Sequence, residues 1–123
     1  MAALMIIGSP VIVDRSHIAT TADNATMMMA SHYGGPGDHF NGKPMANGEI
    51  FSSTNPTLAA HKSLPLGTKV KLTNPETGQT QRVVIKDRGP FVKGRDLDIS
   101  YAAAKRLGFV REGTAKLVAE VIR

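Results

Sequence analysis

Residues 86–100 read KDRGPFVKGRDLDIS, and the rest of the chain is organised around this stretch. It follows an apolar run, VVI at 83–85, which is typical of a buried strand. It ends at Ser100, which is placed to cap a short helix over residues 101–107 that Gly108 would close. Three carboxylates and four cations, with two glycines and a proline, predict a loop between these elements. Because sites are often built on loops held by a packed scaffold, this loop is the first candidate for chemistry.

The composition indicates one globular domain with an excess of positive charge. At 123 residues, 41% of them hydrophobic and 20% charged, the chain can bury one core and is too short for two ordinary domains. A net charge of +5 and a pI of about 9.8 favour an anionic partner, such as nucleic acid, a membrane surface or a cell-wall polymer. The absence of cysteine excludes disulfides, thiolate metal sites and a cysteine nucleophile.

Residues 1–26 are interpreted as an appendage to this domain. Their apolar runs, 2–7 and 11–13, are separated by GSP at 8–10, and neither is long enough to span a bilayer. No basic segment precedes the first run, as a secretory signal would require. A processed or engineered leader, a tag, an extra edge strand and a secreted protein that has lost its signal all remain as alternatives.

The remaining residues carry mostly strand and turn signals. A first strand is predicted at 27–33, before a glycine-rich loop and two Asn-Gly turns. Asn-Pro-Thr at 55–57 indicates a helix start, so residues 58–62 are predicted to form a single helical turn. The clearest hairpin pairs residues 68–73 with 79–86. A final strand at 114–122 is apolar on both sides, and we expect both faces to be buried.

Two segments repeat one another. AAHKSL at 59–64 precedes Gly-Thr at 67–68, and AAAKRL at 102–107 precedes Gly-Thr at 113–114. Two copies of a helical turn, a loop and a strand predict a pseudo-twofold β structure around one core. The alternative is a chance match between alanine- and lysine-rich segments.

Several motifs in this order resemble the double-psi β-barrel domain of the rare lipoprotein A family. They are ASHYG at 30–34, FNGK at 40–43, ANGEIF at 46–51, LAAHKSLPLGT at 58–68, and residues 83–104. The resemblance implies a mainly β fold: a six-stranded double-psi β-barrel with pseudo-twofold symmetry and one or two short helices. The barrel domain would occupy residues 27–123.

Members of that family are septal lytic transglycosylases. The resemblance therefore implies a lyase that cleaves the MurNAc–GlcNAc bonds of peptidoglycan, preferring denuded glycan strands, and leaves 1,6-anhydro products without using water. It also implies an endolytic enzyme without a cofactor or metal, located in the periplasm or cell envelope. We expect a monomer whose partner is peptidoglycan, together with septal or outer-membrane envelope proteins, and no nucleic acid.

The family's functional residues fall on three positions of this sequence. The aspartate of its Asp-Arg-Gly-Pro motif is Asp87, the carboxylate after Asn-Gly is Glu49, and the histidine of Ala-Ala-His-Lys is His61. The chain departs from the family pattern at His32, where an aromatic residue is more usual. It also departs in a longer loop at 35–39 and in KPM at 43–45. All three departures lie near the expected glycan groove and concern substrate preference more than fold.

The proposed reaction requires one carboxyl group to give a proton to the glycosidic oxygen and then to take one from the sugar's 6-hydroxyl. Asp87 suits this role at the end of a strand. Lys86 and Arg88 flank it and favour the ionised form, but strand alternation sends these neighbours to the opposite face, so burial or a nearby Glu49 could still favour the acid. The alternative is a structural aspartate that binds loop amides.

The remaining candidates also have structural alternatives. Glu49 could be a solvated hairpin residue, and His61 could be a structural histidine rather than one that orients substrate. Tyr33 and Phe91 are expected to line a sugar-binding groove unless they belong to the core.

Two cations and one further aspartate complete the set. Arg88 and Lys62 are expected to bind substrate. Asp98 is expected to interact with the N-terminus of the following helix, which would be a structural role. His32 and His39 bracket the glycine-rich loop, but no further ligand is spaced to complete a metal site.

Two other functional classes remain. The same barrel could bind wall polysaccharide without cutting it, as expansin-like relatives of this barrel do. DNA binding is the generic inference from the basic pI, but no predicted helix is long enough to read a groove and the cations are spread along the chain.

Overall fold

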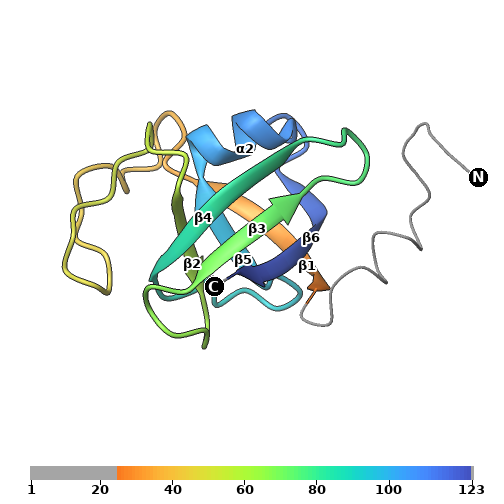
Figure 1. Ribbon diagram of the computed structural model, residues 1–123. Coiled ribbons are helices and arrows are strands. Elements are labelled where there is room, and N and C mark those ends of the chain that lie inside the picture. Colours follow the sequence, from red (N-terminus) through yellow and green to blue (C-terminus); the bar gives the residue numbers. More distant parts are fainter. Residues whose placement is uncertain (1–24, 123) are drawn as a thin grey trace, which may run out of the picture.

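Six strands and one short helix make up residues 25–122, the part of the chain that the computed structural model describes (Figure 1). In chain order they are β1 (Ala25–Tyr33), β2 (Leu58–His61), β3 (Lys69–Thr73), β4 (Thr80–Asp87), β5 (Leu97–Ser100), α2 (Tyr101–Leu107) and β6 (Thr114–Ile122). The predicted first strand, hairpin, helix and final strand are confirmed. β1 begins slightly earlier than predicted, and residues 1–24 of the proposed appendage lie outside the described residues.

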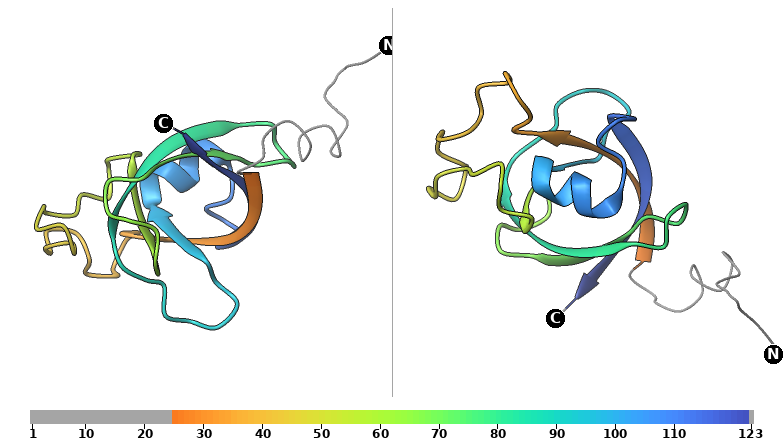
Figure 2. Two further views of the ribbon diagram at one scale, coloured as in Figure 1. Left: turned by 60° about the horizontal axis from the view of Figure 1, so that its bottom comes forward. Right: turned by 90° about the horizontal axis from the view of Figure 1, so that it is seen from above.

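The strands form a closed barrel in the order β1-β5-β2-β4-β3-β6, which Figure 2 shows from two sides. The pairs β1–β5 and β2–β4 are parallel, and the other four pairs are antiparallel. If β1 is exchanged with β4, β2 with β5 and β3 with β6, each pair of neighbouring strands becomes another neighbouring pair of the barrel. The two pairs are then either both parallel or both antiparallel. The barrel therefore has the pseudo-twofold symmetry that the sequence predicts.

An apolar core fills the barrel, and α2 packs against one end of it, as the view from above in Figure 2 shows. The core side chains include Ala30, Ala59, Val70, Leu72, Val83, Ile85, Leu97, Ile99, Leu107, Phe109 and Leu117. Ser100 caps the helix, because its Oγ accepts the Ala103 N–H at 3.1 Å. Gly108 ends it in the left-handed conformation (φ 80°) and donates its N–H to Ala104 O.

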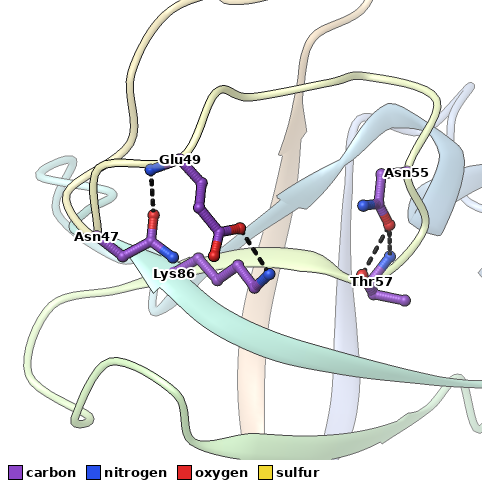
Figure 3. Close-up of polar contacts among 5 residues, drawn as sticks. All are labelled: Asn47, Glu49, Asn55, Thr57 and Lys86. Atoms are coloured by element: carbon purple, nitrogen blue, oxygen red, sulfur yellow. Dashed lines mark hydrogen bonds and ion pairs between the residues drawn. The ribbon is translucent and has the colours of Figure 1, made fainter.

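The predicted helical turn at residues 58–62 is wrong, because this segment forms strand β2. The Asn55 side chain accepts the N–H and the hydroxyl of Thr57, which closes an Asx turn instead of capping a helix (Figure 3). The chain then enters the barrel between β4 and β5, where Leu58, Ala59 and Ala60 are all buried. Pairing with two neighbouring strands overrides the helix propensity of the alanines.

Two other strands differ from the sequence prediction. β5 lies inside the stretch that the sequence predicts to be a loop. Its buried Leu97 and Ile99 alternate with half-buried Asp98, which is a strand pattern, but it extends over only four residues. In β6, Leu117 and Ala119 are buried while Lys116 is exposed, so the prediction of burial on both faces is wrong.

The sequence repeat was aligned incorrectly in its first part. The barrel symmetry relates β2 to β5, both four residues long, rather than to α2. The Gly-Thr part of the repeat does match the symmetry, because it precedes β3 in one half and opens β6 in the other.

Residues 34–57, here called the outer loop, leave the barrel between β1 and β2 and project from its side (Figure 1). Within this loop Met45 donates its N–H to Glu49 O at 2.7 Å, and Pro44 pairs with Ile50 in a β-bridge. These contacts make a small hairpin around the second predicted Asn-Gly turn, at residues 47–48. The loop covers a second apolar cluster, composed of Tyr33, Met45, Phe51 and Leu58.

Candidate functional site

The C-terminal end of β4 carries Asp87, the predicted acid. Ala60 of β2 is its register partner across the parallel pair. One carboxylate oxygen, Oδ1, accepts the N–H groups of Ala46 and Arg88, each at 2.9 Å. The residue is half-buried, and among the described residues no donor reaches its Oδ2. The carboxylate is thus oriented through one oxygen while the other stays available.

Glu49 reaches the same strand end from the outer loop. Its carboxylate Oε1 accepts a hydrogen bond from Lys86 Nζ at 2.8 Å, and Asn47 Oδ1 accepts the Glu49 N–H at 2.9 Å (Figure 3). The backbone of Asn47 also donates to Lys86 O at 3.1 Å. With the Ala46 bond to Asp87, the hairpin is attached to two successive residues of β4.

Lys86 has a contact that its position beside Asp87 in the sequence does not indicate. It forms the single ion pair within residues 25–122, with side-chain exposures of 24% for the lysine and 57% for Glu49. This pair attaches the Glu49 carboxylate to β4, one residue before Asp87.

His61 ends β2, one residue beyond Ala60. Its Nδ1 accepts the N–H groups of Ser63 and Leu64, both at 3.0 Å, so this nitrogen holds a lone pair and the neutral ring carries its proton on Nε2. Burial lowers the pKa of His61, and the charges of Arg88 and Lys62 lower it further, while Asp96 acts in the opposite direction. The imidazole is therefore neutral at pH 7 and can donate a hydrogen bond through Nε2.

Arg88 joins this histidine segment to the end of β4. Its Nη1 donates to His61 O at 3.1 Å and to Leu64 O at 2.7 Å, and the side chain is half-buried. These contacts hold His61 beside the β4 end. Binding of substrate by Arg88 stays a prediction, as it does for Lys62, whose side chain is exposed.

The two predicted aromatic groove residues have different environments. Tyr33 is buried in the small cluster, stacked on Phe51 at 4.3 Å and edge-on to Phe40 at 5.6 Å. Its buried hydroxyl has no hydrogen-bond partner within the described residues. Burial raises the pKa of Tyr33, and the negative charges of Asp87 and Asp98 raise it further. Phe91 is 79% exposed and is open to a ligand.

Asp98 was assigned to the helix N-terminus, and that prediction is wrong. Ser100 caps α2, and the first turn contains no acidic residue. The Asp98 carboxylate accepts the Ser31 hydroxyl at 2.7 Å, and its register partner is Ala60, which is also the partner of Asp87. Burial raises the pKa of Asp98, although the Ser31 hydrogen bond and the charge of Arg95 act to lower it. Recognising β5 as a strand would have revealed this placement.

Within residues 25–122, no group of three or more His, Cys, Asp or Glu side chains is arranged to hold a metal ion. None of the helices there is long and apolar enough to cross a membrane.

The curated relatives of this chain include several endolytic peptidoglycan transglycosylases. The chain is 48% identical over 94 residues to the probable endolytic peptidoglycan transglycosylase RlpA of Nostoc sp., covering 76% of this chain and 25% of the relative. It is 45% identical over 93 residues to the endolytic peptidoglycan transglycosylase RlpA of Rickettsia bellii, covering 76% and 40%. For the RlpA of Vibrio cholerae the identity is 48% over 86 residues, covering 70% and 32%. The chain thus spans less than half the length of these relatives.

Solved structures share the barrel. The Streptomyces papain inhibitor superimposes with a TM-score of 0.63 at 18% identity, covering 84% of this chain and 98% of that one, which shows a common fold only. The expansin of Clavibacter michiganensis gives a TM-score of 0.60 at 25% identity, covering 80% of this chain and 50% of the expansin. The sequence profile of the lytic transglycolase family matches residues 25–119, from the first residue of β1 into β6. Because that match takes in the barrel and every residue gathered at the end of β4, the chain belongs to the lytic transglycolase family, with a double-psi β-barrel as its fold.

Proposed function

We propose that this domain is an endolytic peptidoglycan lytic transglycosylase that cleaves MurNAc–GlcNAc bonds of denuded glycan strands and leaves 1,6-anhydro products. The observation that carries the proposal is the attachment of the Glu49 hairpin and the His61 segment to the end of β4, on either side of Asp87. The names of the relatives support the same reaction class. With peptidoglycan as its substrate, we expect the domain to act in the periplasm or cell envelope.

In the first step Asp87, in its acid form, gives its proton to the glycosidic oxygen. The bond between that oxygen and C1 of MurNAc breaks, the GlcNAc end leaves as an alcohol, and positive charge develops at C1. The carboxylate of Glu49 stabilises this charge, and the ion pair with Lys86 holds the Glu49 side chain in place. The Nε2–H of His61 donates a hydrogen bond that orients the sugar.

In the second step the Asp87 carboxylate removes the proton of the MurNAc 6-hydroxyl, and O6 bonds to C1. The acid form of Asp87 is restored, and neither water nor a cofactor is consumed. One side chain serves as acid and then as base, which agrees with an arrangement in which Oδ1 accepts two backbone N–H groups and Oδ2 has no donor within residues 25–122.

The test uses denuded glycan strands and the purified domain. Mass spectrometry should detect anhydro-terminated fragments with the wild type and none above background with Asp87→Asn, which preserves shape and both acceptor contacts at Oδ1. Lys116→Gln, a change at an exposed cation of β6, serves as the control and should cut normally. Equal activity of Asp87→Asn and wild type would refute the assignment of Asp87.

The second candidate is a wall-polysaccharide binder that does not cut. The likeness to the Clavibacter expansin, at a TM-score of 0.60 and 25% identity, favours it. Retention of the wild type on purified cell wall, without any release of fragments from denuded strands, would select this function over the enzyme.

A further inference from the structure

A cavity of about 580 Å³ lies between the outer loop and the first turn of α2, and it contains none of the residues proposed for catalysis. Its walls come from Gly34 to His39 with Asn41 on one side, Ser53 and Thr54 on the other, and Tyr101 and Lys105 of α2. The volume falls within the range of ordinary small-molecule pockets, roughly 300–1,000 Å³. Nothing proposed above uses this cavity.

Hydrogen bonds hold the walls in place. The carboxylate of Asp38 accepts the N–H groups of Gly34, Gly35 and Phe40. Asp38 is the one acidic side chain of the lining, and these three donors partly balance its negative charge. Asn41 Oδ1 accepts the Ser53 N–H at 2.8 Å and ties the two sides of the loop together.

The same walls are attached to the helix. Ala102 donates its N–H to Ser53 O at 3.0 Å, which links α2 to the outer loop. Gly35 lies so close to the Tyr101 ring that an added Cβ would be 3.2 Å from it. The pocket is therefore preformed.

The floor of the pocket, formed by α2, carries the aromatic ring of Tyr101 and the cation of Lys105. Lys105 lies one turn after Tyr101, with Nζ at 6.0 Å from the centre of the ring, and no carboxylate pairs with it among residues 25–122. The ring of His32 packs at nearly a right angle to the Tyr101 ring, with 5.7 Å between the ring centres, and it contacts Val110 O through Nε2. Such a floor suits a sugar ring that carries a negative charge.

We propose that this pocket is a saccharide subsite that takes a MurNAc residue away from the cleaved bond, with its lactyl carboxylate paired to Lys105 and its ring against Tyr101. The inference rests on the proposed peptidoglycan substrate. In a strand without stem peptides the lactyl group is a free carboxylate, whereas in a peptide-bearing strand it is a neutral amide. An ion pair with Lys105 therefore favours the denuded strand.

The test measures binding by calorimetry in an Asp87→Asn background, where fragments stay intact. The probes are denuded glycan hexasaccharides with free lactyl carboxylates and the same hexasaccharides with those groups converted to methylamides. We expect the free acid to bind up to about fivefold more tightly, the scale of an exposed ion pair. Lys105→Gln should abolish this difference, Lys105→Arg should keep it, and Lys116→Gln should leave it unchanged.

Equal affinity for the two probes, or a preference that survives Lys105→Gln, would overturn the subsite. Either result would leave the cleavage assay unaffected, because that assay reports on Asp87. Conversely, a preference that depends on Lys105 in a protein that releases no fragments would support the subsite and refute the enzyme.

Discussion

Asp87 and Asp98 lie on either side of Ala60, each as its register partner from a neighbouring strand. With strands about 4.8 Å apart, their backbones are separated by roughly 10 Å. Both negative charges reach the buried hydroxyl of Tyr33 and raise its pKa. The proposed acid is thus accompanied by a second carboxylate that stands on the rigid barrel wall rather than on a loop.

Asp98→Asn should make the protein more stable at neutral pH. Burial raises the pKa of Asp98 above its ordinary value of 3.8, so the folded state holds this proton more tightly than the unfolded state. The contribution is present below pH 3.8 and is lost as the pH rises through the folded pKa. Asparagine can still accept the Ser31 hydrogen bond without a buried charge.

Thermal unfolding from pH 3 to pH 8 checks this. The melting temperature of Asp98→Asn should exceed that of the wild type at pH 7, and the gap should shrink toward acid. The comparison is Asp96→Asn, at a carboxylate that accepts the Met29 N–H. A gap that widens toward acid would contradict the direction assigned to Asp98.

His61 should titrate below pH 6.5. Its folded pKa is lowered, mainly by burial, and protonation of Nδ1 would break its bonds to Ser63 and Leu64. The corresponding stability is fully present above pH 6.5 and is lost as the pH falls through the folded pKa. Long-range ¹H–¹⁵N NMR, with His61→Gln to assign the signal, should find the proton on Nε2. A midpoint above 6.5 would contradict the lowered pKa, and a proton on Nδ1 of the neutral ring would exclude the proposed donor role.

The hairpin of β3 and β4 and the cap and end of α2 could be predicted because local residues determine them. Alternating Val70 and Leu72 specify one strand, and Ser100 and Gly108 specify the helix ends. β2 could not be recognised by the same means, because its Leu-Ala-Ala-His sequence favours a helix locally and becomes a strand only between β4 and β5.

Only the family resemblance predicts that the candidate site residues come from segments that meet at the end of β4. Glu49, His61 and Asp87 come from three separate segments, and pairing between distant strands and the hairpin contacts bring them together. The placement of Asp98 depends on strand β5, which is only four residues long, and the role of Lys86 depends on a contact with a residue 37 positions away in the sequence. Such contacts leave no local pattern.

Lys86→Met should lower kcat while leaving stability almost unchanged. Glu49 is exposed and Lys86 half-buried, so the loss of this pair should alter the free energy of unfolding by no more than about 1 kcal/mol. Without the ammonium group Glu49 is no longer held over the β4 end, and its stabilisation of positive charge weakens. Lys86→Arg should restore most of the rate, and Lys116→Met should have no effect. Full activity of Lys86→Met would show that Glu49 needs no partner.

Gly34→Ala should destabilise the protein more than Gly37→Ala does. Both glycines adopt a left-handed conformation, with φ of 87° and 85°, so alanine carries a backbone cost of roughly 1–2 kcal/mol at either position. They differ in their surroundings: a Cβ at Gly34 would be 2.6 Å from the Phe51 ring, whereas nothing lies within 4 Å of a Cβ at Gly37. That ring stacks on Tyr33, so the clash reaches the apolar cluster beneath the outer loop. Chemical denaturation of the two variants isolates the packing contribution, and equal losses of stability would mean that the outer loop shifts freely over the barrel.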